Sequence, residues 1–238
     1  MDTSMILLGV ALVMLIYIIF FYATGTDNIS ARMDLAQSQT PIDSSKLTKP
    51  ESAKYSYELW LYVYGTKENA GTNVYLFSRE GTDSTSVAPL KNIGLKLNGT
   101  VPSLTLDYTT KATAIAAPAK ASVLITDNLP LQSWVHVIVS VDNSFIDIYM
   151  NGKLVKSVKD ATIATPSVDA PINFENSKTY LAKFSRTIMP TDPQTAWNNY
   201  LAGNGENPMK KLVGNYGLSL AFTKDNLNAY NLNILGGQ

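Results

Sequence analysis

The sequence predicts an all-β protein, an antiparallel sandwich or barrel with one short helix, preceded by an N-terminal transmembrane helix. Three observations lead to this prediction. An uncharged apolar run lies close to the N-terminus, many short strand-like runs follow residue 54, and one segment after residue 190 has a helical pattern. We therefore expect an anchor at 1–25, a polar tether at 26–53 and one globular domain at 54–238.

The predicted anchor is the run MILLGVALVMLIYIIFFY at residues 5–22. A helix of this length rises about 27 Å, close to the roughly 30 Å hydrocarbon core of a bilayer. Aromatic residues gather at its C-terminal end, where their rings favour the headgroup zone. The residues taken as the membrane anchor are Met5, Leu8, Leu15, Ile19, Phe21 and Tyr22.

Two alternatives for this run are a cleaved signal peptide and a buried core helix. Small residues at 23–25 would suit a signal-peptide cleavage site. The start of the chain opposes that alternative, because it carries Asp2 and no Lys or Arg, and the run exceeds the usual length of about 7 to 15 residues. An uncleaved anchor is the favoured interpretation.

The flanking charges predict the orientation of this anchor. Arg32, Lys46 and Lys49 follow the run, and no basic residue precedes it. Because basic residues gather on the cytoplasmic side of a membrane, the large C-terminal part is expected in the cytosol. The chain has no Cys, which agrees with a compartment where disulfides are rare.

Residues 26–53 are rich in Ser, Thr, Gln and Asp, and two prolines interrupt any regular structure. This composition predicts a flexible tether between anchor and domain. The alternative is a short helix over 27–37, where apolar residues are thinly spaced.

The pattern changes to period two at Lys54. The stretch KYSYELWLYVY places one set of residues on a predicted core face: Tyr55, Tyr57, Leu59, Leu61 and Val63. Similar runs follow, separated by Gly, Pro, Asn and Asp: NVYLFSR, NIGLKL, SLTLDY, SVLIT, SWVHVIVSVD, FIDIYM, KLVKSV, TYLAKF, YGLSLAF and YNLNIL. Many short strands without helical segments between them predict an antiparallel sandwich or barrel.

The clearest local signal is a β-hairpin. The runs FIDIYM and KLVKSV are separated by Asn151-Gly152, and both residues tolerate the positive φ of a type I′ turn. The preceding run WVHVIVSVD places its four valines on one face, so the three runs predict a meander with the valine face toward the core.

One helix is predicted after the strand TYLAKF. Asp192 can cap it, Pro193 suits its first turn, and Gly203 can end it. Trp197, Tyr200 and Leu201 recur at helical spacing, so this helix is expected to pack on the sandwich with Trp197 buried.

The segment 129–155 reads LPLQSWVHVIVSVDNSFIDIYMNGKLV, and it resembles the concanavalin A-like lectin/glucanase superfamily in its laminin G-like branch. The runs YSYELWLYV and YLAKFSRTIMPTDPQTAWNNYLAGNG are similar to an early strand and to a late strand with its short helix. The resemblance spans about residues 54–205 and implies a jelly-roll β-sandwich. The superfamily includes sugar binders, adhesion modules, glycoside hydrolases and structural domains, so the fold alone selects no function.

The residues argue against catalysis. Glucanases of this fold carry paired carboxylates as Glu-x-Asp-x-x-Glu, and none of the six Glu in this chain has Asp two positions later. A Ser-His-Asp triad would need His136, which is expected to have a partly exposed or hydrogen-bonded structural role. One His and no Cys cannot build a His/Cys metal cluster. We therefore expect no catalytic residue, no cofactor and no enzyme activity.

Calcium stays an alternative, because relatives in the resembled superfamily bind it through oxygen atoms of their loops. The loop residues that could contribute are Asp83, Asp127, Asn128, Asp142 and Asn143. Ordinary turn chemistry also explains them. Glycan binding would call for an exposed aromatic ring near amide and carboxylate groups, which Tyr62, Tyr64 or Tyr75 could supply.

The segment NPMKKLVGNYGLSLAFTKDNLNAYNLNIL is not standard for a laminin G-like module, and its strands could complete the sandwich or extend an edge toward a partner. Together with WNNYLAGNG, it is similar to versions of this domain in large DNA viruses, some of them membrane-anchored. Such proteins resemble minor structural components of the particle.

The first functional hypothesis is a non-catalytic, membrane-anchored structural protein, a minor capsid component that links an internal membrane to the protein shell. It would be a single-pass protein of a virion internal membrane or host endomembrane, with the lipid bilayer and other capsid proteins as partners. The alternative is a membrane-anchored lectin or adhesion module that binds glycans. With 19 basic and 19 acidic residues and no basic cluster, nucleic acid is not expected as a partner.

Overall fold

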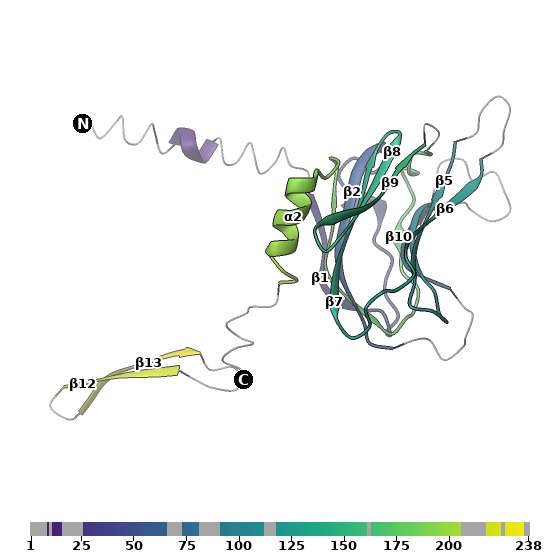
Figure 1. Cartoon of the computed structure of the whole chain (residues 1–238). Coiled ribbons are helices and arrows are strands. Elements are labelled where there is room, and N and C mark those ends of the chain that lie inside the picture. Colours follow the sequence, from purple (N-terminus) through teal and green to yellow (C-terminus); the bar gives the residue numbers. More distant parts are fainter. Residues whose placement is uncertain are drawn as a thin grey trace. The chain divides into compact units, whose positions relative to one another are not determined.

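The computed structural model describes residues 9, 11–15, 26–65, 73–80, 91–111, 118–160, 163–205, 218–224 and 227–235. The chain divides into two compact units, Met1–Asn204 and Gly205–Gln238. The first unit contains a sandwich of two antiparallel sheets with one short helix against it (Figure 1), which confirms the all-β sandwich expected from the sequence.

The two sheets differ in width. The six-stranded sheet has the order β1 (Thr26–Asp34), β11 (Thr179–Thr187), β2 (Lys54–Val63), β7 (Trp134–Asp142), β8 (Phe145–Met150) and β9 (Lys153–Lys159). The five-stranded sheet has the order β10 (Ile172–Asn173), β3 (Val74–Glu80), β4 (Lys91–Leu97), β5 (Leu104–Thr109) and β6 (Lys120–Thr126). All predicted strands up to residue 184 are present, with small differences at their ends.

The core lies between the sheets, where the predicted faces of β2 and β7 meet the inner faces of β4 and β5. The four valines of β7 are at most 1% exposed, as the alternation predicted. Aromatic rings join the sheets, since the ring centroids of Tyr57 and Phe77 are 4.9 Å apart and those of Phe77 and Phe184 are 5.1 Å apart. Such offset aromatic pairs add to the apolar burial that holds a sandwich together.

The hairpin between β8 and β9 is confirmed. Asn151 and Gly152 have φ angles of 50° and 76°, the left-handed conformation that a type I′ turn requires. A Cβ atom on Gly152 would lie 2.8 Å from Cε3 of Trp197, so this glycine also allows the helix to approach the turn.

The predicted helix is α2 (Pro193–Leu201), and Asp192 caps it by accepting hydrogen bonds from the backbone N–H groups of Gln194 and Thr195. The expectation that Trp197 is buried is wrong. The helix contacts the sheet through the small side chain of Ala196, which packs on buried Ile138 and Tyr149. Trp197 lies against Gly152 in the β8–β9 turn and is 38% exposed.

The expected tether at 26–53 is wrong, and so is the alternative helix over 27–37. Residues 26–34 form β1, an edge strand antiparallel to β11. This pairing satisfies backbone groups of β11 that would otherwise form the edge of the sheet. The following residues also belong to the sandwich, since Leu35 is fully buried and Ile42 pairs with Ile172.

Two buried arginines hold this segment in place. Arg186 donates to the carbonyl oxygens of Thr48 at 2.7 Å and Lys49 at 3.0 Å, and it lies 3.3 Å from the carboxylate of Asp27. Arg79 donates to the carbonyl oxygen of Pro50 at 2.7 Å. The polar composition of this segment therefore does not make it a tether, because its backbone carbonyl groups and Asp27 are partners for buried guanidinium groups.

The second unit contains its own antiparallel pair, β12 (Leu218–Lys224) and β13 (Leu227–Leu235). These strands match the predicted runs YGLSLAF and YNLNIL. They pair with each other in a separate two-stranded sheet, so the domain expected at 54–238 is divided near residue 205.

Most of the predicted anchor lies outside the described residues, including Met5, Leu8, Ile19, Phe21 and Tyr22. Residues 11–15, which include Leu15, are helical. Within the described part of the chain, no helix combines the length and apolar character needed to cross a membrane.

Candidate functional site

The outer face of the six-stranded sheet carries a line of three aromatic side chains, Tyr180, Tyr62 and Trp134. They lie directly opposite one another on the neighbouring strands β11, β2 and β7. The ring centroids of Tyr62 and Trp134 are 5.4 Å apart, and those of Tyr62 and Tyr180 are 6.3 Å apart. All three are half-buried. We call them the aromatic row.

The alternation of β2 explains why the row faces outward. Leu61 and Val63 point into the core, so Tyr62 between them must point away from it. Residues directly opposite on antiparallel strands have Cβ atoms roughly 5 Å apart, which brings their rings into contact. The sheet register therefore builds one continuous aromatic surface from three separate strands.

Polar groups border the row. Tyr64 lies beside Tyr180, with ring centroids 4.8 Å apart, and its hydroxyl donates to Oδ1 of Asp34 at 3.2 Å. Burial and the nearby charge of Asp34 raise the pKa of Tyr64, so it remains a neutral donor at neutral pH. The guanidinium group of Arg32 lies over two rings of the row, with its carbon 5.4 Å from the ring centroid of Tyr180 and 5.8 Å from that of Trp134.

Next to the row, α2 covers the sheet. Trp60 lies directly opposite His136 on β7, and the Tyr200 ring of α2 stacks on Trp60 with centroids 5.7 Å apart and planes at 16°. His136 is fully buried, so the expectation of partial exposure is wrong. Its expected alternative, a hydrogen-bonded structural role, agrees with its contact to Glu58.

The carboxylate of Glu58 lies where α2 meets the sheet. Its Oε1 is 3.1 Å from Nε2 of His136, and its Oε2 accepts from Nδ2 of Asn199 at 2.7 Å. The side chain is 22% exposed. Two cavities of about 520 and 470 Å³ meet here, and both are lined by Glu58, Ser185 and Asn199. We call the two cavities together the Glu58 groove.

A second carboxylate, Asp192, lines one end of this groove. Hydrogen bonds from the Thr195 side chain and from the backbone N–H groups of Thr195 and Gln194 lower the pKa of Asp192. A general acid in glycoside hydrolysis needs a raised pKa, so the chemistry of Asp192 suits a helix cap instead.

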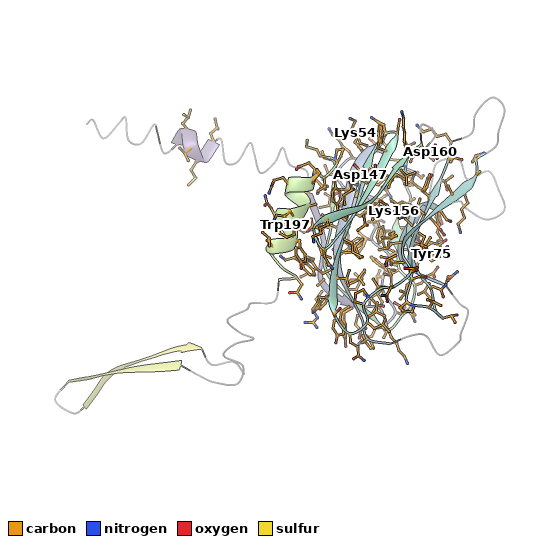
Figure 2. All side chains as sticks on the ribbon, viewed as in Figure 1. Lys54, Tyr75, Asp147, Lys156, Asp160 and Trp197 are labelled. Carbon is orange, nitrogen blue, oxygen red and sulfur yellow. The ribbon has the colours of Figure 1, made fainter. Side chains whose placement is uncertain are left out.

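Tyr75, the third aromatic residue considered in the sequence, lies on β3 of the five-stranded sheet (Figure 2), whereas the row lies on the six-stranded sheet. Its ring lies across Gly94, and its hydroxyl donates to Oδ2 of Asp107 at 2.6 Å. Burial alone would raise the pKa of Asp107, but hydrogen bonds from Lys120, Ser122 and Tyr75 bring it down to about 2. This cluster stabilises its own sheet, and Tyr75 is separate from Tyr62 and Tyr64.

The loop residues considered for calcium are dispersed. Asp83 lies outside the described residues, and Asp142 forms an ion pair with Lys54 at 2.8 Å. Asp127 and Asn128 follow β6, and Asn143 is in the β7–β8 turn. Among the residues that the structure describes, no group of three or more His, Asp or Glu is placed to hold a metal ion.

Tyr62 and Tyr64 could be identified from the sequence, whereas Trp134, Tyr180 and Glu58 were not predicted as site residues. A signal for Trp134 was present, because it begins the face opposite the four valines of its strand. Tyr180 and Asn199 had no such signal, since their positions next to Tyr62 and Glu58 depend on pairing between distant segments.

Comparison with known proteins supports this fold. A family model described as the concanavalin A-like lectin/glucanases superfamily matches residues 36–188. Among curated proteins, none matches the sequence significantly.

Solved structures with a similar sandwich include the binding domain of Paraclostridial Mosquitocidal Protein 1, at a TM-score of 0.50 and 10% identity over 84% of this chain and 52% of that chain. The botulinum neurotoxin type G receptor-binding domain matches at a TM-score of 0.46 and 16% identity, over 64% and 38% of the two chains. A Trypanosoma rangeli sialidase matches at 0.47 and 10%, over 65% and 24%. The chain thus spans about half or less of these proteins, and the likeness concerns the fold.

Proposed function

Because the chain belongs to the concanavalin A-like lectin/glucanases superfamily, we propose that its sandwich is a non-catalytic binding module that recognises glycans on the outer face of the six-stranded sheet. The observation that carries this proposal is the aromatic row. Three half-buried rings lie side by side on one rigid sheet, bordered by hydrogen-bonding groups.

The chemistry of the row suits a sugar. The faces of aromatic rings carry partial negative charge, and the C–H groups of a pyranose carry partial positive charge, so the two surfaces attract when they stack. Hydroxyl groups of the sugar need donors and acceptors, which Asp34 and Tyr64 supply beside the rings and Arg32 supplies over them. A few polar groups around an apolar platform are typical of ligand sites in proteins.

The geometry also supports a preorganised site. Residues on paired strands lose little freedom on binding, because the sheet already holds their backbone. Tyr62 is central, since it contacts both Tyr180 and Trp134. It should therefore contribute most to affinity.

A glycan array with the full chain tests this proposal. We expect binding to one glycan class, and Tyr62→Ala should weaken it at least about tenfold, the cost of losing an aromatic residue at a binding hot spot. Phe145→Ala is the matched control, because Phe145 is an exposed ring of the same sheet outside the row. Equal binding by wild type and Tyr62→Ala would overturn the proposal.

The second part of the proposal concerns the cellular setting. Residues 5–22 anchor the chain in a virion internal membrane or a host endomembrane, and the C-terminal part lies on the side that faces the protein shell. This setting is supported by the apolar character of that run and by the basic residues after it. Linkage of the membrane to capsid proteins stays a prediction. Protease treatment of intact particles tests it, because cleavage of the sandwich while the shell is whole would contradict an internal position.

A further inference from the structure

The Glu58 groove has chemistry that the aromatic row does not use. We propose that it binds a protonated primary amine carried by a sugar unit, so that the preferred glycan contains an amino sugar with a free amine. This inference rests on the proposed glycan binding and specifies its ligand class.

Glu58 has room for another partner. A carboxylate offers about four lone-pair sites on its two oxygens. His136 and Asn199 occupy one site on each oxygen, and the side chain remains 22% exposed at the meeting point of the two cavities. A donor that enters the groove can therefore reach this carboxylate.

The two protein contacts of Glu58 are hydrogen bonds from the His136 ring and from the side-chain amide of Asn199. Nε2 of His136 faces the carboxylate and so carries a hydrogen atom, while Nδ1 is buried without a hydrogen-bond partner. Asn199 is uncharged, so its hydrogen bond leaves the charge of Glu58 uncompensated.

The remaining charges leave the groove negative. Of its described lining residues, Lys183 is the basic one, and its Nζ donates to the carbonyl oxygen of Gly203 at 2.6 Å. Glu58 and Asp192 contribute two negative charges and Lys183 one positive charge, which gives a net charge of about −1 at neutral pH. A cationic ligand group complements this charge.

The rest of the lining favours an ammonium group on a polyhydroxylated ligand. It consists largely of hydroxyl and amide side chains: Asn28, Ser30, Ser185, Thr187, Thr191 and Thr195. An ammonium has three N–H donors, and one carboxylate can satisfy only part of them. The oxygen atoms of these side chains can accept hydrogen bonds from the remaining N–H groups of the ammonium and from sugar hydroxyl groups.

The position of the groove links it to the aromatic row. Glu58, Trp60 and Tyr62 alternate on β2, so Glu58 lies roughly 13 Å along the strand from Tyr62. Tyr200 covers Trp60, but the groove continues along β1, where Asn28, Ser30 and Ala31 line it. At this separation, a ligand that contacts both sites has to be an oligosaccharide, because a monosaccharide is too short.

Paired probes test this inference with the full chain. The first is a β-1,4-linked glucosamine oligomer, and the second is the same oligomer fully N-acetylated. Wild type should bind the free-amine oligomer roughly tenfold more tightly, since a charge-assisted hydrogen bond has about this effect. Glu58→Gln, which keeps the shape and removes the charge, should abolish the preference but retain binding of the acetylated oligomer.

Two further variants complete the test. Ser185→Lys places an ammonium of the chain in the groove while Glu58 stays, so it should also abolish the preference. Tyr62→Ala should weaken both oligomers equally, which reports on the row alone. Thermal unfolding of each variant controls for folding.

The outcomes separate the two proposals. A preference for the free amine that survives Glu58→Gln, or no binding of the free-amine oligomer, overturns the role of the groove. Loss of that preference in Glu58→Gln, with acetylated-oligomer binding insensitive to Tyr62→Ala, supports the groove and contradicts the row. Lysine amide and its Nε-acetyl form are a second pair of probes. If the chain prefers lysine amide by the same factor as it prefers the free-amine oligomer, the sugar assignment is overturned.

Discussion

Tyr62 on β2 and Trp134 on β7 lie directly opposite each other, with ring centroids 5.4 Å apart on the outer face of the sheet. These residues are separated by more than seventy positions in the chain. Their contact exists because β2 and β7 are neighbours in the six-stranded sheet. The proposed glycan surface depends on this pairing.

The contact should also contribute to stability. A double-mutant cycle of Tyr62→Ala and Trp134→Ala is expected to give a coupling energy of about 0.5 to 1.5 kcal/mol, the usual value of an aromatic pair. Urea unfolding of the wild type and the three variants measures it. As a control, Tyr62→Ala with Phe145→Ala should be additive, because the two rings are not in contact. A zero coupling between Tyr62 and Trp134 would contradict the row.

Gly94 is expected to be intolerant of a side chain. A Cβ atom there would lie 2.7 Å from Cε1 of Tyr75, so Gly94→Ala must displace the ring and break its hydrogen bond to Asp107. We expect a destabilisation of about 1 to 3 kcal/mol in urea unfolding. The same substitution in a Tyr75→Ala background should cost much less, since the obstructing ring is gone. Equal costs in both backgrounds would show that the ring is not the cause.

Asp107 should make stability depend on pH in the acid range. Its pKa is about 2 in the folded chain against an ordinary value of 3.8. The unfolded chain therefore binds more protons between these values, so stability is present above pH 3.8 and is lost as pH falls toward 2. The loss is expected to be about 2 kcal/mol.

Urea unfolding of wild type and Asp107→Asn at several pH values from 5 to 2 tests this. The difference in free energy of unfolding between the two proteins should shrink as the pH falls. A difference that stays constant over the range would contradict the lowered pKa.

Arg186 should determine whether β1 stays on the sheet. It is fully buried and contacts Asp27 on β1 and the carbonyl oxygens of Thr48 and Lys49. Arg186→Met removes the charge and leaves these partners unpaired, which should destabilise the chain by about 3 kcal/mol. Amide hydrogen exchange of residues 26–34 should become faster than in wild type. Lys156→Met on exposed β9 is the control and should change neither quantity.

The local structure of this protein could be predicted well from its sequence. The alternation of β2, the valine face of β7, the Asn151-Gly152 turn and the Asp192 cap were all confirmed. Each depends on residues within a few positions of one another, where backbone geometry repeats with a period of two or 3.6. Trp197 shows the limit of such reasoning, because helical spacing could not reveal that Ala196 is the helix residue that is buried against the sheet.

Pairing between distant segments explains why β1 and the candidate site could not be predicted from the sequence. Residues 26–34 have a polar composition and no strong alternation, yet they form β1 because β11 offers them a free edge and Arg186 a buried partner. The candidate site has the same origin. Tyr180 meets Tyr62, and Asn199 meets Glu58, only after distant segments have paired or packed.

By itself, the sequence determined that this chain forms many antiparallel strands, one capped helix and a type I′ hairpin, and it carried the superfamily resemblance. The tertiary structure decided which strands are neighbours, which face of the six-stranded sheet α2 covers, and where the aromatic row and the Glu58 groove lie. The physical reason is that side-chain alternation is a property of each strand, whereas the neighbours of a side chain across a sheet depend on strand order and register.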